Sequence, residues 1–394
     1  STRATRYLSR NDLLKSREAT TSMISLARPR RFWLITAHTW MALSLSRSLR
    51  SKPIARAGIR SMAQFAYKSN LPAGKRHFLH VDDLSSAEFR EVIDLAKKIK
   101  PILKGGPGLV GPEGRYERAK GEKPVTYKPF TDQTLPMIFV KPSARTRVSF
   151  ETGWWMLGGH AFVLGDEIGI GKREATKDIS RVLAGYNDLV MARLFAHKDI
   201  IELAKYSNIP VVNGLTDHNH PCQIMADLMT VKEHKGTLEG LKFAWVGDGN
   251  NVSASFIHAA PKFGFALDMA CPAGYRPNQG MIETANAEGG KVRLTDMDSA
   301  LEGADVVVTD CWVSMGDEDY DARMAALSPY QINEKTMAQA KDDAIFLHCL
   351  PAHRNEEVTD AVIDGPQSVV FDEAENRLHA QKGVLLYCLN GLPS

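Results

Sequence analysis

The sequence contains few cysteines and no long apolar segment. Its five cysteines, Cys222, Cys271, Cys311, Cys349 and Cys388, are odd in number and widely spaced, and no two form a Cys-x-x-Cys pair. This pattern argues against a disulfide framework or a cysteine-based zinc site and favours reduced thiols. No uninterrupted apolar run approaches the roughly 20 residues that a membrane-spanning helix needs, so we expect no stable membrane association.

Acidic residues are scarce in the first 75 residues, which contain 15 Lys or Arg but only Asp12 and Glu18. The whole chain has a formal net charge of +3, and this segment alone carries +13, so the remainder carries −10. A folded body of that sign is not expected to bind nucleic acids, because phosphate backbones need a basic surface.

The basic segment, residues 1–75, is rich in Arg and Ser, which is typical of an organelle-targeting segment. From Met41 onward, apolar and basic residues interleave in a way that could form a basic amphipathic helix. We therefore predict a location in the mitochondrial matrix, with the plastid stroma as the alternative. Two alternatives to a targeting segment remain. The segment could be a disordered basic tail, or the part before Met41 could be translated sequence outside the natural reading frame.

Beyond this tail, apolar runs of strand length alternate with amphipathic segments, which predicts an α/β fold of two domains, each a central parallel sheet flanked by helices. The first series has strands at 137–140, 162–165, 189–193 and 211–214, with helices at 147–157, 177–186 and 198–206. The second series has strands at 243–247, 266–270, 292–294, 306–310 and 344–349. A helix at 222–234 links the two series.

We accordingly expect domains at residues 76–221 and 222–377, with a C-terminal helix at 378–391 packing back on the first domain. Residues 105–129 are rich in Gly, Pro and charge, which indicates a surface loop or insertion.

The motif Lys-Pro-Ser-Ala-Arg-Thr-Arg at 141–147 lies between a predicted strand and a predicted helix. An anion at such a turn gains hydrogen bonds from free backbone N–H groups and interacts favourably with the helix dipole. Ser143 and Thr146 add hydroxyl donors, and the guanidinium of Arg145 suits a phosphate. The motif therefore predicts a phosphate site; the alternative is a Ser-capped helix with two solvated arginines.

A second motif, Asn-His-Pro-Cys-Gln at 219–223, follows a predicted strand and opens a helix. His220 and Gln223 would thus lie at the carboxyl end of a parallel sheet, where α/β proteins bind ligands. A neutral His220 could polarise a carbonyl oxygen by donating a hydrogen bond. Arg193, at the end of another strand, would add a cation. The alternatives are that His220 is an ordinary loop histidine and that Arg193 forms a salt bridge at the rim.

The second series opens with the turn Val-Gly-Asp-Gly-Asn-Asn at 246–251, which matches a dinucleotide-binding fingerprint only in part. Gly247 and Gly249 are present, but Val252 occupies the third glycine position, and the next strand does not end in an acid that could bind a ribose. Asn251 could equally receive the carboxylate of an amino acid.

Two more strand ends carry polar residues, Asp-Cys-Trp-Val-Ser-Met-Gly at 310–316 and Leu-His-Cys-Leu-Pro at 347–351. Asp310 offers a carboxylate to an ammonium group, and the loop at 314–316 can approach a small ligand closely. Cys349 could contact a reacting amine, or it could be an inert buried thiol.

These motifs, in this order, resemble the ornithine carbamoyltransferases from about His77 to the C-terminus. The resemblance rests on Ser-x-Arg-Thr-Arg at 143–147, His-Pro-Cys-Gln at 220–223, Asp-x-x-x-Ser-Met-Gly at 310–316, His-Cys-Leu-Pro at 348–351 and Ala-Glu-Asn-Arg at 374–377. It implies an enzyme, usually a homotrimer, that transfers the carbamoyl group of carbamoyl phosphate to the side-chain amine of L-ornithine. The products are L-citrulline and phosphate, as in arginine biosynthesis and the urea cycle.

The resemblance also implies residue roles. Carbamoyl phosphate would be bound by Ser143, Ala144, Arg145, Thr146, Arg193, His220, Gln223, Leu350 and Arg377. L-Ornithine would be bound by Asn251, Asp310, Ser314, Met315 and Cys349. The catalytic residues would be Arg145, His220, Asp310 and Cys349. We expect no cofactor and no metal, because carbamoyl phosphate is already activated.

Two positions depart from the family pattern. Ala144 replaces a common Thr but can act through its backbone, whereas Gly169 stands where relatives often have Gln or His reaching into a neighbour's site, which puts that contact in doubt. Three rival functions remain: a carbamoyltransferase acting on aspartate, putrescine or acetylornithine; a nicotinamide-dependent oxidoreductase built on the Gly247 turn; and a non-catalytic binding relative.

Overall fold

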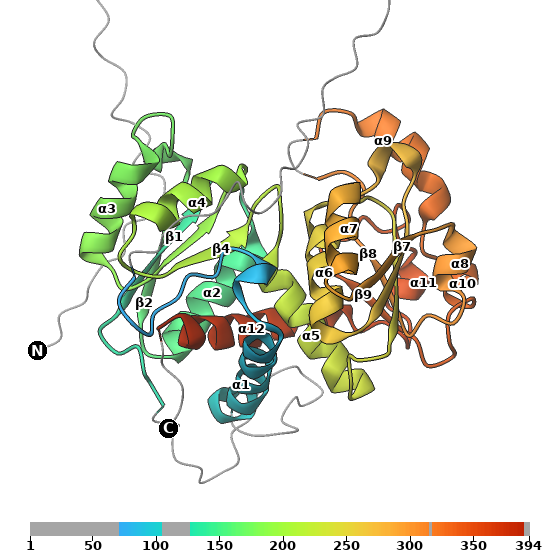
Figure 1. Ribbon diagram of the computed structural model, residues 1–394, viewed down its shortest axis with the longest axis horizontal. Coiled ribbons are helices and arrows are strands. Elements are labelled where there is room, and N and C mark those ends of the chain that lie inside the picture. Colours follow the sequence, from blue (N-terminus) through green and yellow to red (C-terminus); the bar gives the residue numbers. More distant parts are fainter. Residues whose placement is uncertain (1–70, 105–126, 315–316, 390–394) are drawn as a thin grey trace, which may run out of the picture. The chain divides into compact units, whose positions relative to one another are not determined.

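The computed structural model describes residues 71–104, 127–314 and 317–389, with the side chains of 102–104 left out. Residues 1–70 of the predicted targeting segment, most of the predicted loop at 105–129, and Met315 lie outside the described residues. Within them the chain forms two parallel sheets flanked by helices (Figure 1), which confirms the predicted α/β fold class.

The first sheet has four parallel strands in the order β2-β1-β3-β4. The strands are β1 (Thr134–Phe139), β2 (His160–Leu164), β3 (Val190–Arg193) and β4 (Val211–Leu215). Its nearest helices are α2 (Ala144–Met156), α3 (Thr176–Tyr186) and α4 (His197–Tyr206). All four strands were predicted within three residues at each end.

Burial on both faces explains why β1 is almost continuously apolar. Leu135 and Met137 face a core that includes Phe150 and Trp154 of α2. Ile138 points the other way, into a core formed with α3 and α4.

The second sheet has five parallel strands in the order β7-β6-β5-β8-β9. They are β5 (Lys242–Val246), β6 (Ala266–Ala270), β7 (Lys291–Leu294), β8 (Val306–Thr309) and β9 (Ile345–His348). The helices of this part are α6 (Asn251–Phe263), α7 (Gln279–Ala287), α8 (Met297–Leu301), α9 (Tyr320–Leu327), α10 (Glu334–Met337) and α11 (Asp360–Ile363). Short 3-10 turns are η2 (Val81–Asp83), η3 (Asp166–Ile168), η4 (Ala273–Tyr275) and η5 (Ser328–Tyr330).

Three long helices complete the fold: α1 (Ser86–Lys104), α5 (Pro221–Lys235) and α12 (Val370–Leu389), and α12 packs against α1, α2 and α5. Two predicted starts were wrong. Helix α12 begins at residue 370 rather than 378, with Asp372 and Glu373 favourably placed in its first turn, so Arg377 lies inside the helix. Helix α2 begins at Ala144 rather than 147, because the Ser143 hydroxyl already accepts from the Thr146 N–H.

Gly169, the position that departs from the family pattern, has a local structural role. It ends η3 in the left-handed conformation, with a φ of 65°, and its N–H donates to the carbonyl of Asp166. Glycine adopts this conformation without steric cost, so the turn itself accounts for the residue.

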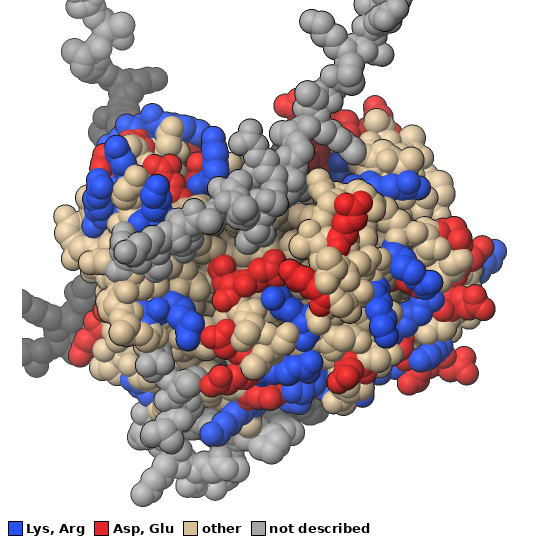
Figure 2. All heavy atoms as spheres, in the orientation of Figure 1, with Lys and Arg blue, Asp and Glu red and all other residues tan. Residues whose placement is uncertain are grey.

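Basic and acidic side chains are interspersed on the face of the molecule drawn in Figure 2. Among the helices of the described residues, none combines the length and the apolar character needed to cross a membrane.

Candidate active site

A cavity of about 510 Å³ lies where strands of both sheets reach their carboxyl ends. Every predicted binding residue except Met315, which is outside the described residues, lines this cavity. The lining also includes residues to which we had assigned no role: Lys141, Pro142, Leu215, Val252, Cys311, Val313, Pro351 and His353. Segments up to about 230 residues apart in sequence therefore meet at one site, as expected for ligand sites in parallel α/β sheets.

The first turn of α2 forms one wall. The Ser143 hydroxyl accepts a hydrogen bond from the N–H of Thr146 at 3.3 Å and lies 3.1 Å from the Thr146 hydroxyl. The other N–H groups of a first helical turn have no partner within the helix. This wall therefore offers backbone donors, hydroxyl donors and the positive end of the helix dipole.

Cationic side chains surround this turn. Arg377 of α12 donates from Nη2 to the Thr146 hydroxyl at 3.3 Å, and from Nη1 to the side-chain oxygen Oε1 of Gln223. Arg193 donates from Nε to the backbone oxygen of Lys141 at 3.1 Å. Burial and the neighbouring Arg377 lower the pKa of Arg193 to about 10, and burial with the nearby Arg193 lowers the pKa of Lys141. Such a concentration of buried positive charge favours a bound anion.

His220 caps the start of α5 and is almost completely buried. Its backbone N–H donates to the Ser255 hydroxyl at 2.9 Å, and within the described part of the chain its Nδ1 has no hydrogen-bond partner. Burial, followed by the charges of Arg377 and Arg193, holds its pKa well below the ordinary value. The imidazole is therefore neutral at physiological pH and can donate one hydrogen bond to a ligand.

The second sheet contributes an acidic wall centred on Asp310. Its Oδ1 accepts from the N–H of Cys311 at 2.8 Å and from the thiol of Cys349 at 3.1 Å. Its Oδ2 accepts from the side-chain amide of Asn250 at 2.7 Å. Burial and the adjacent Asp310 hold the pKa of Cys349 well above its ordinary value, so the group is a thiol rather than a thiolate.

Asn250 is a functional candidate that the sequence analysis missed. Its Oδ1 caps α6 by accepting from the N–H groups of Val252 and Ser253, at 2.9 and 3.1 Å, while its amide nitrogen positions Asp310. The signal was available, because Asn is a preferred helix-capping residue and stands directly before α6. Its neighbour Asn251, which we did predict, donates to the backbone oxygen of Thr216 at 2.6 Å.

A buried acid pair lies behind Gln223. The Gln223 amide nitrogen donates to Asp227 Oδ1 at 2.7 Å and to Glu373 Oε1 at 2.9 Å. Burial raises the pKa of Asp227 to about 7, and burial together with Asp227 raises that of Glu373 well above its ordinary value. The i,i+4 spacing of Gln223 with Asp227 and of Glu373 with Arg377 could have indicated these residues.

The Gly247 turn has no room for the pyrophosphate of a dinucleotide at Gly249. A side-chain carbon on Gly249 would lie 2.3 Å from the backbone nitrogen of Pro277, and the Gly249 N–H donates to the Tyr275 oxygen at 2.7 Å. The chain's own backbone thus fills the space that a dinucleotide fingerprint keeps open. This geometry argues against the nicotinamide-dependent rival.

Two family matches together span most of the described chain. Residues 76–233 match the carbamoyl-P binding domain of the aspartate/ornithine carbamoyltransferases, and residues 239–388 match the Asp/Orn binding domain of the same family. The chain belongs to this family. The predicted domain boundary between residues 221 and 222 stays a prediction.

Individual relatives of this family agree with the match. The chain is 48% identical over 326 residues to an ornithine carbamoyltransferase of Rhodopseudomonas palustris strain BisA53, covering 82% of this chain and 99% of the relative. It is 49% identical over 316 residues to that of Nitrobacter winogradskyi, covering 80% and 97%. The solved ornithine carbamoyltransferase from Pyrococcus furiosus superimposes with a TM-score of 0.73 at 42% identity, covering 83% of this chain and all of that one.

These relatives overturn the predicted location. Family members that match this chain at nearly half of the aligned positions come from bacteria, which have neither mitochondria nor plastids. The prediction of the mitochondrial matrix, with the plastid stroma as its alternative, was therefore wrong. It depended on the basic segment at 1–75, which lies before the first residue of either family match.

Proposed function

We propose that this cavity transfers the carbamoyl group of carbamoyl phosphate to the side-chain amine of L-ornithine, giving L-citrulline and phosphate. One observation carries the proposal: two different sites line a single cavity. The first is the start of α2 with the arginines around it, and the second is the hydrogen-bonded pair Asp310 and Cys349 at the second sheet. One side suits a phosphate dianion, and the other suits a cationic amino acid.

Carbamoyl phosphate binds with its phosphate on the turn at 143–146. Ser143 and Thr146 donate through their hydroxyls, Ala144 through its backbone, and Arg145 through its guanidinium. Arg193 and Arg377 offset the remaining negative charge. Gln223, held by Arg377 and by the acid pair behind it, and Leu350 border the carbamoyl end.

L-Ornithine binds on the opposite wall. Its ammonium groups are drawn to the carboxylate of Asp310, which Asn250 and Cys311 hold in place. Asn251 and Ser314 receive the α-amino-acid end, and the sequence resemblance adds Met315 to them. Cys349 lies beside the reacting amine and orients it as a neutral thiol.

The amine must lose a proton before it attacks, since its unperturbed pKa resembles the ~10.4 of lysine. The cationic wall favours that loss. The neutral amine then forms a C–N bond with the carbamoyl carbon, while His220 and Thr146 donate to the oxygen on which negative charge develops. Collapse breaks the bond from that carbon to the phosphate oxygen, and the attacking nitrogen gives up its extra proton to the departing phosphate. Hydrogen phosphate leaves with its charge already matched by the cationic wall.

The test is formation of citrulline by the full chain from carbamoyl phosphate and L-ornithine. The matched substrates are aspartate, putrescine and acetylornithine, with the ureido products separated by chromatography. We expect L-ornithine to be preferred, because Asp310 suits an ammonium group, which aspartate lacks on its side chain, and Asn251 can receive the carboxylate that putrescine lacks. A preference for aspartate, or absence of any ureido product, would overturn the proposal.

We also propose that the chain assembles as a homotrimer, as the sequence resemblance implied. The proposal is supported by large apolar side chains that stand exposed beside the first sheet, namely Val148 and Trp155 on α2 and Val182 and Tyr186 on α3. Multi-angle light scattering should give three times the mass of one chain, and Trp155→Glu should lower it. A parent protein with the mass of one chain would refute the assembly.

A further inference from the structure

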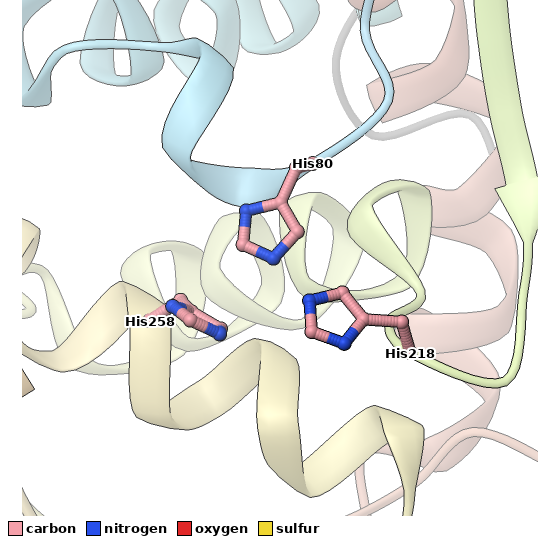
Figure 3. Close-up of side chains that lie close together, drawn as sticks. All are labelled: His80, His218 and His258. Atoms are coloured by element: carbon pink, nitrogen blue, oxygen red, sulfur yellow. The ribbon is translucent and has the colours of Figure 1, made fainter. Parts of the chain in front are cut away.

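Three histidines from separate segments converge beside the cavity, and the chemistry above makes no use of them (Figure 3). His80 directly precedes η2, His218 lies between β4 and α5, and His258 is on α6. All three side chains are buried, and their ligand atoms lie within 4.8 Å of one another. Figure 3 shows the three rings pointing toward a common space.

Asp82 orients two of these rings from behind. Its Oδ2 lies 3.1 Å from Nδ1 of His258 and 3.4 Å from Nδ1 of His80, and its Oδ1 pairs with the ammonium of Lys262 at 3.2 Å. A carboxylate that accepts from Nδ1–H selects the tautomer whose Nε2 has a free lone pair, an arrangement that recurs behind metal-ligating histidines. The Nδ1 of His80 accepts a hydrogen bond from the Asp82 N–H at 3.0 Å. To bind an ion through Nε2, this ring would exchange that bond for one from its Nδ1–H to the Asp82 carboxylate.

The Nε2 atoms of His80 and His258 have no hydrogen-bond partner among the residues that the structure describes. Buried polar atoms without a partner are rare, because desolvation without a compensating bond costs free energy. Burial also lowers the pKa of His80 to about 4 and that of His218 to about 3, so both rings are neutral near pH 7. Neutral imidazole is the form that binds metal ions.

We propose that His80, His218 and His258 form a three-histidine site for a divalent transition-metal ion, with Zn²⁺ as the best match. Three imidazole nitrogen donors suit Zn²⁺, Co²⁺ or Ni²⁺ rather than Mg²⁺ or Ca²⁺, which prefer oxygen. Around a tetrahedral ion with bonds of about 2.0–2.1 Å, ligand atoms stand about 3.4 Å apart. Small rotations of the three rings would bring their nitrogen atoms from the present spacing, within 4.8 Å, to that distance. A water molecule would be the fourth ligand of the ion.

The site would act by positioning rather than by chemistry. His218 lies two residues before His220, and His258 lies on α6, whose first residue is the cavity-lining Asn251. An ion bound here would tie these two elements to the segment that carries His80. Loading should therefore stabilise the fold without contacting either substrate, and the proposal does not depend on which reaction the cavity performs.

A second set of possible ligands must be removed before the site is tested. Asp310, His348 and Cys349 also lie with ligand atoms within 4.8 Å of one another, but Asp310 and Cys349 line the cavity. A thiolate ligand gives Co²⁺ a strong charge-transfer absorption that imidazole ligands do not give. The parent for the experiment is therefore the full chain carrying Cys349→Ser.

The experiment is a Co²⁺ titration of this parent after chelator treatment, followed by visible absorption, with Zn²⁺ displacement and a thermal melt of each form. We expect one equivalent to bind with a Kd of about 1 µM or tighter, without thiolate absorption, and Zn²⁺ to raise the Tm. His258→Gln and His80→Asn should each weaken binding at least tenfold. Asp82→Asn should weaken it about tenfold by loosening the rings.

His234→Gln is the matched control. This histidine lies in the last turn of α5, away from the cluster, and pairs with Asp372 of α12. It should bind like the parent. Binding in His258→Gln as tight as in the control would overturn the proposal. So would failure of the folded parent itself to bind one equivalent, which is decisive even if a cluster variant does not fold.

Discussion

The two walls of the cavity differ in charge and in how the chain builds them. The wall from the first sheet collects Lys141, Arg145, Arg193 and the helix start of α2, with Arg377 added from α12. The wall from the second sheet centres on Asp310, whose carboxylate accepts from the backbone N–H of Cys311 and from the thiol of Cys349. A cationic wall facing an anionic one can bind an acyl phosphate and a diamino acid together, and each substrate then faces the charge that suits it.

The walls also differ in their supports. On the cationic side, Gln223 joins Arg377 to the buried pair Asp227 and Glu373, and the raised pKa values of this pair disfavour negative charge behind the phosphate turn. On the anionic side, Asp310 receives three hydrogen bonds that fix its carboxylate. The comparison therefore predicts that changes to one wall impair the use of one substrate.

The largest effect should follow from Arg145→Ala. Losing a preorganised cationic donor should lower kcat/KM for carbamoyl phosphate roughly 10²–10³-fold, with an unchanged fold by circular dichroism. Arg147→Ala is the matched control, since that exposed arginine pairs with Glu151 and does not line the cavity. Steady-state kinetics with carbamoyl phosphate as the varied substrate would decide, and near-normal turnover of Arg145→Ala would contradict the assignment.

The opposite wall is tested by Asp310→Asn. Hydrogen bonds to charged groups contribute about 1.5–3 kcal/mol, so the KM for L-ornithine should rise roughly 10–100-fold while that for carbamoyl phosphate changes little. Asp319→Asn, in the same loop region but exposed, is the control. Equal rises in both KM values would mean that the two walls are not independent.

The same contrast explains what the sequence could predict. The nine strands that the described residues form were all located, because buried parallel strands are continuous apolar runs. The residues at their carboxyl ends were found because parallel strands end at one edge. The cationic turn could be read from seven consecutive residues. Asn250, Asp227 and Glu373 were missed, because each acts through another side chain that only the folded chain brings near it.

A smaller effect is expected from Cys349→Ser. The thiol donates to Asp310 at 3.1 Å, and replacing it with a hydroxyl alters one hydrogen bond worth about 1 kcal/mol, so the KM for L-ornithine should change about fivefold. Cys271→Ser is the matched control, because that buried thiol does not line the cavity. If Cys349→Ser leaves the KM for L-ornithine unchanged, its placement beside the amine is wrong.

The smallest effect on turnover is expected from Asp227→Asn. This variant tests whether the buried acid behind Gln223 is protonated, and the quantity measured is the free energy of unfolding. The pKa of Asp227 is raised from 3.8 to about 7, so between these values the folded state binds more protons than the unfolded state, and the free energy of unfolding falls as pH rises. Asparagine mimics the protonated acid and should flatten that fall. Urea unfolding of parent and variant at several values between pH 4 and 8 would measure it, with Asp321→Asn on exposed α9 as the control. A parent and variant with the same slope would mean that Asp227 is ionised in the folded protein, and the cationic wall would then have a negative charge directly behind it.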